Sequence, residues 1–255
     1  MIRAASIRRN GRLARTTGRT NRSLPQHTKC CGSEMERNEE AMRIVVALLI
    51  GTVLMLGVHL FCCRWYSLPR KTVILNAPVL TICGFAGVKL MFFIESGGWT
   101  GLSFFGAVFF VPVLYLLMSR LLRANCLDLL DISAPSICIM LALMKVECVV
   151  TGCCKGKILY ETAAGEVVRF PSQIAEMINA LFLMVLLMII MRKQKNRGRI
   201  YPWFMVLYGI TRFGWNLLRE TKPFVWVLPA GNFWSLIAIV IGVLWLLIDR
   251  KKIWS

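Results

Sequence analysis

The chain has 255 residues, a formal net charge of +18 and a mean hydropathy of +0.62, and 57% of its residues are hydrophobic. Such a chain is too apolar for an ordinary soluble domain, and it contains several apolar runs of about twenty residues, the length of a membrane-spanning helix. The positive charge does not indicate a nucleic-acid-binding protein, because the basic residues lie between the apolar runs or in one leading tail. We therefore expect a membrane protein without a nucleic-acid partner.

The leading tail is basic and polar, with no acidic residue before Glu34 and no apolar period. We expect residues 1–42 to form a disordered tail ahead of a membrane domain at residues 43–255. An arginine-rich, acid-free leader can mimic an organelle transit peptide. It is also what translation from an upstream start codon would add, since Met35 and Met42 directly precede the first apolar run. We prefer this second interpretation, or a dispensable tail.

Seven apolar runs are long enough to cross a bilayer as helices, although the third is only marginally so. No segment of appreciable length alternates between apolar and polar residues as a strand does. The sequence therefore predicts an all-α polytopic membrane protein with about seven transmembrane helices. The predicted spans are residues 44–63, 73–94, 102–118, 132–151, 173–191, 200–218 and 229–248.

The basic residues between these runs predict the orientation of the chain. One set of connections carries thirteen lysines and arginines, whereas the opposite set carries five, in residues 152–172 and 219–228. Because cytoplasmic connections carry the excess of lysine and arginine, we expect the C-terminus in the cytoplasm and the N-terminus outside. The basic tail would then lie outside, which conflicts with the rule and argues against the tail being part of the mature protein.

Polar residues inside the predicted spans gather at their outer ends. A charged side chain in hydrocarbon costs about 2.5 kcal/mol or more, so a chain that keeps one usually pairs it or presents it to a ligand. Lys145 lies near the end of the fourth span and Glu176 near the start of the fifth, while Arg212, Asn216 and Arg219 share one helical face around the end of the sixth. Cations and amides gathered at one membrane face suit an anionic phospholipid head group.

The cysteines divide into two groups. Five of the ten are expected to be small apolar fillers, namely Cys62, Cys63, Cys83, Cys126 and Cys138. Cys148, Cys153 and Cys154 lie on the predicted outer side, where they can form a disulfide or provide a reactive thiol. Three cysteines without a histidine partner do not match the usual zinc patterns, so we expect no metal and no cofactor.

Four motifs, in chain order, resemble those of the prolipoprotein diacylglyceryl transferase family, over about residues 44–250. Residues 148–156 are similar to a cysteine-bearing form of the family signature, in which Gly-Cys-Cys-x-Gly replaces Gly-Glu-x-x-Gly. Residues 170–176, Phe-Pro-Ser-Gln-Ile-Ala-Glu, resemble His-Pro-Ser-Gln-Leu-Tyr-Glu. Residues 207–220 resemble Tyr-Gly-x-x-Arg followed by x-x-x-Glu-x-x-Arg-Glu, and residues 230–235 resemble Gly-Gln-x-x-Ser.

This resemblance implies a multi-pass enzyme of the bacterial plasma (inner) membrane with its site facing the outer side. Such enzymes move a diacylglyceryl group from phosphatidylglycerol, a membrane lipid, to the lipobox cysteine in the signal peptide of a prolipoprotein. Arg212 and Lys145 would bind the lipid phosphate, with Arg219 outside them. The supporting residues would be Ser172, Gln173, Asn216, Cys153 and Gly152.

The chain departs from the family pattern at polar positions. Phe105 stands where the family has a histidine implicated in catalysis, and a phenyl ring cannot accept a proton. Lys145 replaces an arginine, which keeps the charge but loses the planar fork that grips a phosphate with two hydrogen bonds. Cys153 and Asn216 each replace a glutamate.

Without that histidine, either a carboxylate takes the proton of the acceptor thiol, with Glu176 preferred over Glu147, or no base does and the thiol attacks as its minor thiolate fraction. Alternatively, Glu176 is a structural partner of Arg212 or Lys145. Two other functions compete with the transferase. The first is a catalytically silent lipid-binding paralogue that kept the fold and lost the base. The second is a small transporter, which ranks last because the sequence has no inverted repeat.

Overall fold

The structure is a computed structural model that describes residues 34–248, except for residues 67, 100, 123–124, 155, 162–165, 194–196, 220–222 and 226–227. Most of the expected tail therefore lies outside the described residues. Residues 1–41 form one unit, of which only the start of helix α1 (Glu34–Cys62) is described. The helix begins at Glu34, so residues 34–42, which were expected to be disordered, are helical. Everything considered below belongs to the second unit, residues 42–255.

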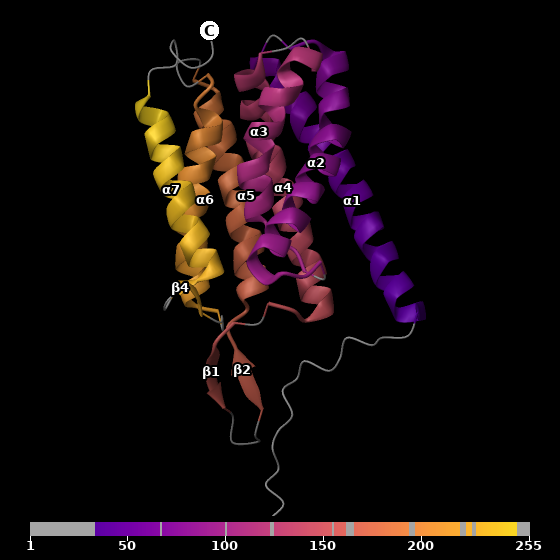
Figure 1. The fold of residues 1–255 in the computed structure, drawn as a ribbon, viewed down its shortest axis with the longest axis vertical. Helices are drawn as coiled ribbons and strands as arrows, with labels where there is room; N and C mark the ends of the chain where they lie inside the picture. Colours follow the sequence, from indigo (N-terminus) through magenta and orange to yellow (C-terminus); the bar gives the residue numbers. More distant parts are fainter. Residues whose placement is uncertain are drawn as a thin grey trace, which may run out of the picture. The chain divides into compact units, whose positions relative to one another are not determined.

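Each of the seven predicted spans is a helix, and helices α2 to α7 run alongside one another (Figure 1). A short 3-10 helix, η1 (Cys63–Trp65), follows α1. The starts and ends lie within a few residues of those predicted for most of the spans. The remaining helices are α2 (Arg70–Ser96), α3 (Phe105–Leu122), α4 (Cys126–Thr151), α5 (Ser172–Met191), α6 (Ile200–Leu217) and α7 (Ala230–Leu247).

Within the part of the chain that the structure describes, five helical segments are long and apolar enough to cross a membrane, so the chain is a multi-pass membrane protein. Helix α3 contributes only a shorter apolar segment, Phe105–Leu117, within the described residues. Helix α6 is not among the five, and it carries Arg212 and Asn216 near its end. The five segments are Ala41–Trp65, Arg70–Ser96, Cys126–Thr151, Ser172–Met191 and Ala230–Leu247.

Two antiparallel hairpins interrupt the helical pattern. Strand β1 (Ile158–Glu161) pairs with β2 (Val167–Arg169) between α4 and α5, and β3 (Pro223–Val225) pairs with β4 (Leu228–Pro229) between α6 and α7. The described chain is mostly helical, and these short strands were not predicted. Strands of two to four residues are too short to leave a period-two pattern in a sequence.

Helix α4 is buried over most of its length and packs against α3, α5 and α6. Its serines at positions 133 and 136 donate hydrogen bonds to backbone carbonyls one turn earlier, so their hydroxyls are satisfied in apolar surroundings. Helices α2 and α3 approach so closely that a Cβ on Gly106 would lie 2.0 Å from the carbonyl oxygen of Gly87. Glycine is therefore required at this crossing.

The start of α6 is anchored on α4. The buried carboxylate of Asp131 accepts hydrogen bonds from the backbone N–H groups of Gly198, Ile200 and Tyr201, and from the hydroxyl of Tyr66. Helices leave their first N–H groups without partners, and a negative charge there is favourable. Arg212 follows about 18 Å further along the helix, at 1.5 Å per residue. The Asp131 anchor therefore fixes the position along the bundle at which Arg212 acts.

Candidate functional site

The site is centred on Glu176, in the second turn of α5. Glu176 is 4% exposed. Its Oε2 accepts hydrogen bonds from Nζ of Lys145, at 2.5 Å, and from Nη1 of Arg212. Its Oε1 lies 3.3 Å from Nη1 of Arg219, just beyond the end of α6. We refer to these four residues as the cation cluster. A lysine of α4, an arginine of α6 and an arginine just after α6 thus contact one carboxylate of α5.

The cation cluster has more positive than negative charge, because three cations share one carboxylate. The side chains of Arg212 and Arg219 are 18% and 13% exposed, so they are mostly buried but reachable. The Nε of each has no hydrogen-bond partner among the described residues. Guanidinium groups with spare donors and excess positive charge are suited to a phosphate, which accepts several charge-assisted hydrogen bonds at once.

A loop of cysteines follows α4 beside the cluster. Gly152 ends the helix in the left-handed conformation, with φ of 64°, as a C-terminal glycine commonly does. The hydroxyl of Ser172 donates to the carbonyl of Cys154 at 2.6 Å, and Nε2 of Gln173 donates to the carbonyl of Cys153 at 2.5 Å. Ser172 and Gln173 thus support the site by holding this loop against the start of α5.

The chain beyond the cysteines is also tied to the end of α6. Gly156 and Arg219 form an antiparallel bridge, and the N–H of Lys157 donates to the carbonyl of Leu218 at 3.0 Å. A Cβ on Gly156 would lie 2.3 Å from the carbonyl oxygen of Phe170, so the close approach there requires glycine. These contacts fix the backbone from which Arg219 reaches Glu176.

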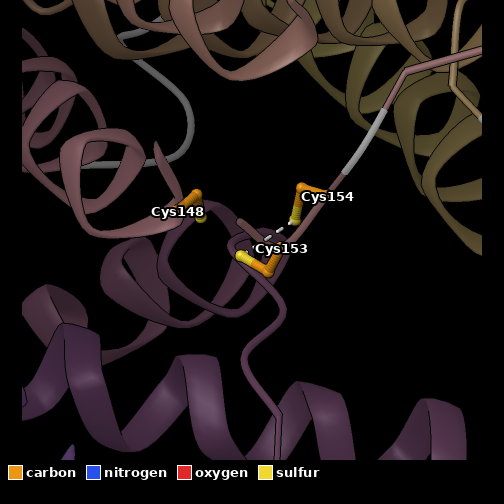
Figure 2. A group of neighbouring side chains, drawn as sticks. All are labelled: Cys148, Cys153 and Cys154. Carbon is orange, nitrogen blue, oxygen red and sulfur yellow. Dashed lines mark hydrogen bonds between the residues drawn. The ribbon is translucent and has the colours of Figure 1, made fainter. Parts of the chain in front are cut away.

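The three cysteines Cys148, Cys153 and Cys154 form a second cluster, which we call the thiol cluster. Their sulfur atoms all lie within 4.8 Å of one another, and the side chains turn toward one another in Figure 2. All three are free thiols, so no disulfide joins them. A hydrogen bond from Cys148, with the nearby charges of Arg219 and Lys145, lowers the pKa of the Cys154 thiol to about 5. This shift favours the thiolate form of Cys154.

Phe105 begins α3 and is 3% exposed. Its ring lies 5.6 Å from that of Tyr208 and 6.0 Å from that of Phe109, measured between centroids. Tyr208 is one helical turn before Arg212. The position at which the resemblance implies a histidine is therefore next to the cation cluster, and packed aromatic rings fill it.

Glu95 is a carboxylate of this region that the sequence analysis missed. It lies in the last turn of α2 and accepts a hydrogen bond from the hydroxyl of Ser103 at 2.7 Å. The charge of Arg212 acts on it. Its signal in the sequence was the same as that of Lys145, an ionisable residue at the end of an apolar run.

Other polar residues lie away from the cluster or have a structural place beside it. Glu147, the alternative base, faces Arg43 at 3.9 Å, and its side chain is 29% exposed. His59 is buried, with its Nε2 3.3 Å from the amide nitrogen of Asn76. Asn216 is buried and packs against Gly231 at the start of α7. A Cβ on Gly231 would lie 2.1 Å from Nδ2 of Asn216.

The fold and the site define a multi-pass helical membrane protein that gathers three cations around one carboxylate at the ends of its helices. The sequence model of the prolipoprotein diacylglyceryl transferase family matches residues 31–248. The chain therefore belongs to the prolipoprotein diacylglyceryl transferase family.

Individual relatives are distant in sequence. The chain is 25% identical over 250 residues to phosphatidylglycerol–prolipoprotein diacylglyceryl transferase 2 of Clostridium perfringens, an alignment that covers 83% of this chain and 97% of that protein. A transferase of Clostridium tetani is 26% identical over 163 residues, covering 60% of this chain and 66% of the relative. One of Francisella tularensis subsp. holarctica is 29% identical over 165 residues, covering 60% of each. The chain thus spans almost all of the first relative and about two thirds or less of the other two.

Proposed function

We propose that this protein transfers a diacylglyceryl group from phosphatidylglycerol to the thiol of a lipobox cysteine in a prolipoprotein signal peptide. Membership of the family supports this reaction, and the relatives carry both substrates in their names. The observation that ties the proposal to this chain is the cation cluster. Its excess positive charge lies at helix ends of a multi-pass membrane protein, where a phospholipid head group is within reach.

The cluster suits the leaving group of this reaction. The sulfur attacks the glyceryl carbon, a C–S bond forms, and the bond from carbon to phosphate oxygen breaks with its electron pair on the oxygen. Glycerol phosphate leaves with added negative charge. Preorganised cations that meet developing charge are usually the largest contribution to catalysis. We assign this role to Arg212 and Lys145, with Arg219 outside them, and we assign Asn216, Cys153 and Gly152 a supporting role.

Glu176 can fill two roles in succession. Its two oxygens accept from all three cations, which supports a role as the counter-ion that holds them together before the lipid binds. A phosphate that takes over the hydrogen bonds of Arg212 and Arg219 would free those oxygens. The carboxylate is then available to accept the proton of the thiol.

We further propose seven spans in the bacterial inner membrane, with the N-terminus outside, the C-terminus in the cytoplasm and the site on the outer side. The unequal distribution of basic residues between the two sets of connections supports this orientation. Helix α6 packs against α4, α5 and α7, and Arg212 is paired with Glu176 inside the protein. These contacts support a sixth span that carries a cation without exposing it to lipid.

A silent lipid-binding paralogue is the second candidate. The packing of Phe105 against Tyr208 and Phe109 favours it, because this leaves an apolar contact where the family has a proton acceptor. The cation cluster would then bind a head group without turnover.

The test is transfer of labelled diacylglyceryl from phosphatidylglycerol to a lipobox peptide by the purified protein in detergent. We expect transfer by the wild type and a loss of roughly a hundredfold or more in Arg212→Ala, the size seen when a stabilising donor is removed. Arg43→Ala is the matched control, since Arg43 is 50% exposed and faces only Glu147 at 3.9 Å among the described contacts. A silent wild type with an active Phe105→His variant would establish the paralogue. Equal rates for wild type and Arg212→Ala would remove Arg212 from phosphate binding.

A further inference from the structure

The thiol cluster has the spacing of a metal ligand set. Among the described residues, Cys148, Cys153 and Cys154 bring three sulfur atoms within 4.8 Å of one another, and the Cys153 and Cys154 sulfurs are 3.7 Å apart (Figure 2). Two thiolates bound to one Zn²⁺ at about 2.3 Å with tetrahedral angles lie about 3.8 Å apart. One pair already matches this distance, and Cys148 needs to approach by an ångström or less, on the order of a side-chain rotation.

The backbone holds these side chains in place. Cys154 has φ of 56°, which is uncommon for a residue other than glycine, and its carbonyl accepts from Ser172. The carbonyl of Cys153 accepts from Gln173. A backbone conformation of this kind persists only where its surroundings determine it, and it commonly marks a functional site. The left-handed turn at Cys154 brings its sulfur back toward Cys148 at the end of α4.

The charges around the cluster also fit. Three thiolates around one Zn²⁺ leave a net charge of −1, and the charges of Arg219 and Lys145 both act on Cys154. Three protein ligands leave the fourth tetrahedral position for an external ligand, the arrangement of catalytic rather than structural zinc sites. The exposed side chain of Cys153 leaves that side of the cluster accessible.

We propose that Cys148, Cys153 and Cys154 bind one Zn²⁺ whose fourth ligand is the acceptor thiol, an inference that rests on the proposed transferase function. A thiol that coordinates Zn²⁺ loses its proton, which Glu176 can accept in its second role, and remains as a thiolate. That sulfur attacks the glyceryl carbon, the C–O bond to phosphate breaks, and glycerol phosphate departs with the electron pair. No oxidant or reductant is involved. The metal supplies what the missing histidine at Phe105 would have supplied, a deprotonated acceptor.

This proposal reverses the expectation that the chain binds no metal. Cys148 and Cys153 have four residues between them, a separation found in zinc motifs, but such motifs add a second pair of ligands further along the chain, and no cysteine or histidine follows Cys154. The glycine that ends α4 and the left-handed turn at Cys154 fold the chain back, so the three sulfur atoms become neighbours.

The first experiment measures zinc apart from any activity. Reduced protein in detergent is loaded with Zn²⁺, freed of excess, and its metal content determined. We expect one zinc per chain in the wild type and in Cys83→Ser, a half-buried cysteine of α2 outside the cluster, and less than a tenth of that in Cys153→Ser. Cys153 is exposed, so its substitution leaves the core intact. Co²⁺ in place of Zn²⁺ should give thiolate-to-metal charge-transfer absorption. Absence of zinc from the wild type, or equal zinc in Cys153→Ser, overturns the site.

The second experiment compares the transfer rate of metal-free and zinc-loaded protein. Removal of zinc should lower the rate roughly a hundredfold, the lower end of what proton-transfer catalysis contributes, and Zn²⁺ but not Mg²⁺ should restore it. Equal transfer without metal overturns the activating role and leaves the transferase function standing. Zinc bound at one per chain without transfer under any condition overturns the transferase function, and the activation of a thiol with it.

Discussion

Replacing Glu176 with glutamine keeps the shape of the side chain and removes the charge that three cations share. Breaking a buried ion pair by removing one partner costs about 3–5 kcal/mol, because the remaining charge is left without compensation. The side chains of Lys145, Arg212 and Arg219 are 9–18% exposed, so water relieves part of this penalty. We therefore expect the lower end, about 3 kcal/mol, or roughly a 150-fold change in the ratio of folded to unfolded protein.

The assay is loss of helical circular dichroism as the purified protein is titrated with a denaturing detergent. Glu147→Gln is the control, because Glu147 faces Arg43 at 3.9 Å near the surface, a kind of pair worth about 1 kcal/mol or less. A Glu176→Gln midpoint no lower than that of Glu147→Gln would refute the view that Glu176 holds the cluster together.

The affinity of the same variant for an anion should change in the opposite direction to its stability. With no carboxylate competing for Arg212 and Arg219, glycerol phosphate should bind Glu176→Gln more tightly, by roughly tenfold for each 1.4 kcal/mol of relieved competition. Isothermal titration with glycerol phosphate measures this directly. Weaker binding in the variant would mean that Glu176 orients the arginines for the anion and does not compete with it.

Three further predictions concern the bundle and the thiol cluster. Gly106→Ala should lower stability by about 1–3 kcal/mol, because the new Cβ would lie 2.0 Å from the carbonyl oxygen of Gly87. Gly84→Ala is the control and should be neutral or stabilising, because no atom lies within 4 Å of a Cβ there. The midpoints of unfolding in denaturing detergent compare the two variants. Asp131→Asn should lower stability by about 1–3 kcal/mol in the same measurement. The carboxylate accepts from three N–H groups and a hydroxyl with two oxygens, whereas an amide has one acceptor oxygen and an NH₂ group that cannot accept. In metal-free protein, the lowered pKa of Cys154 predicts that its alkylation rate changes little between pH 8 and about 6 and falls as the pH drops through about 5. A rate that falls about tenfold for each pH unit between 8 and 6 would contradict it.

The apolar runs were sufficient to predict the helices, because twenty apolar residues in sequence allow few other structures. The charged residues within them predicted the cation cluster for the same reason, since Lys145, Glu176 and Arg212 each need a partner in an apolar setting. The sequence did not predict which oxygen meets which cation, nor that Ser172 and Gln173 turn to the backbone of the cysteine loop.

Features set by single backbone angles or by distant contacts could not be predicted. The left-handed conformation of Cys154 leaves no mark in composition or periodicity, yet it is what brings three thiols together. Glu95 was missed because its nearness to Arg212 depends on how α2 and α6 are placed, and the sequence does not specify which helix ends meet. The hairpins were missed because their strands are shorter than any usable pattern.

The ion pairs of Glu176 also bear on how the chain enters the bilayer during synthesis. Helix α4 emerges from the ribosome before α5, and the two pack directly against each other. Lys145 and Glu176 can therefore partition together as an ion pair within a helical hairpin, instead of each crossing the insertion machinery as a lone charge. Arg212 arrives later and meets a carboxylate already in place. A chain truncated after α5 should thus still insert, whereas one that lacks Lys145 should delay the entry of α5 until α6 has been made.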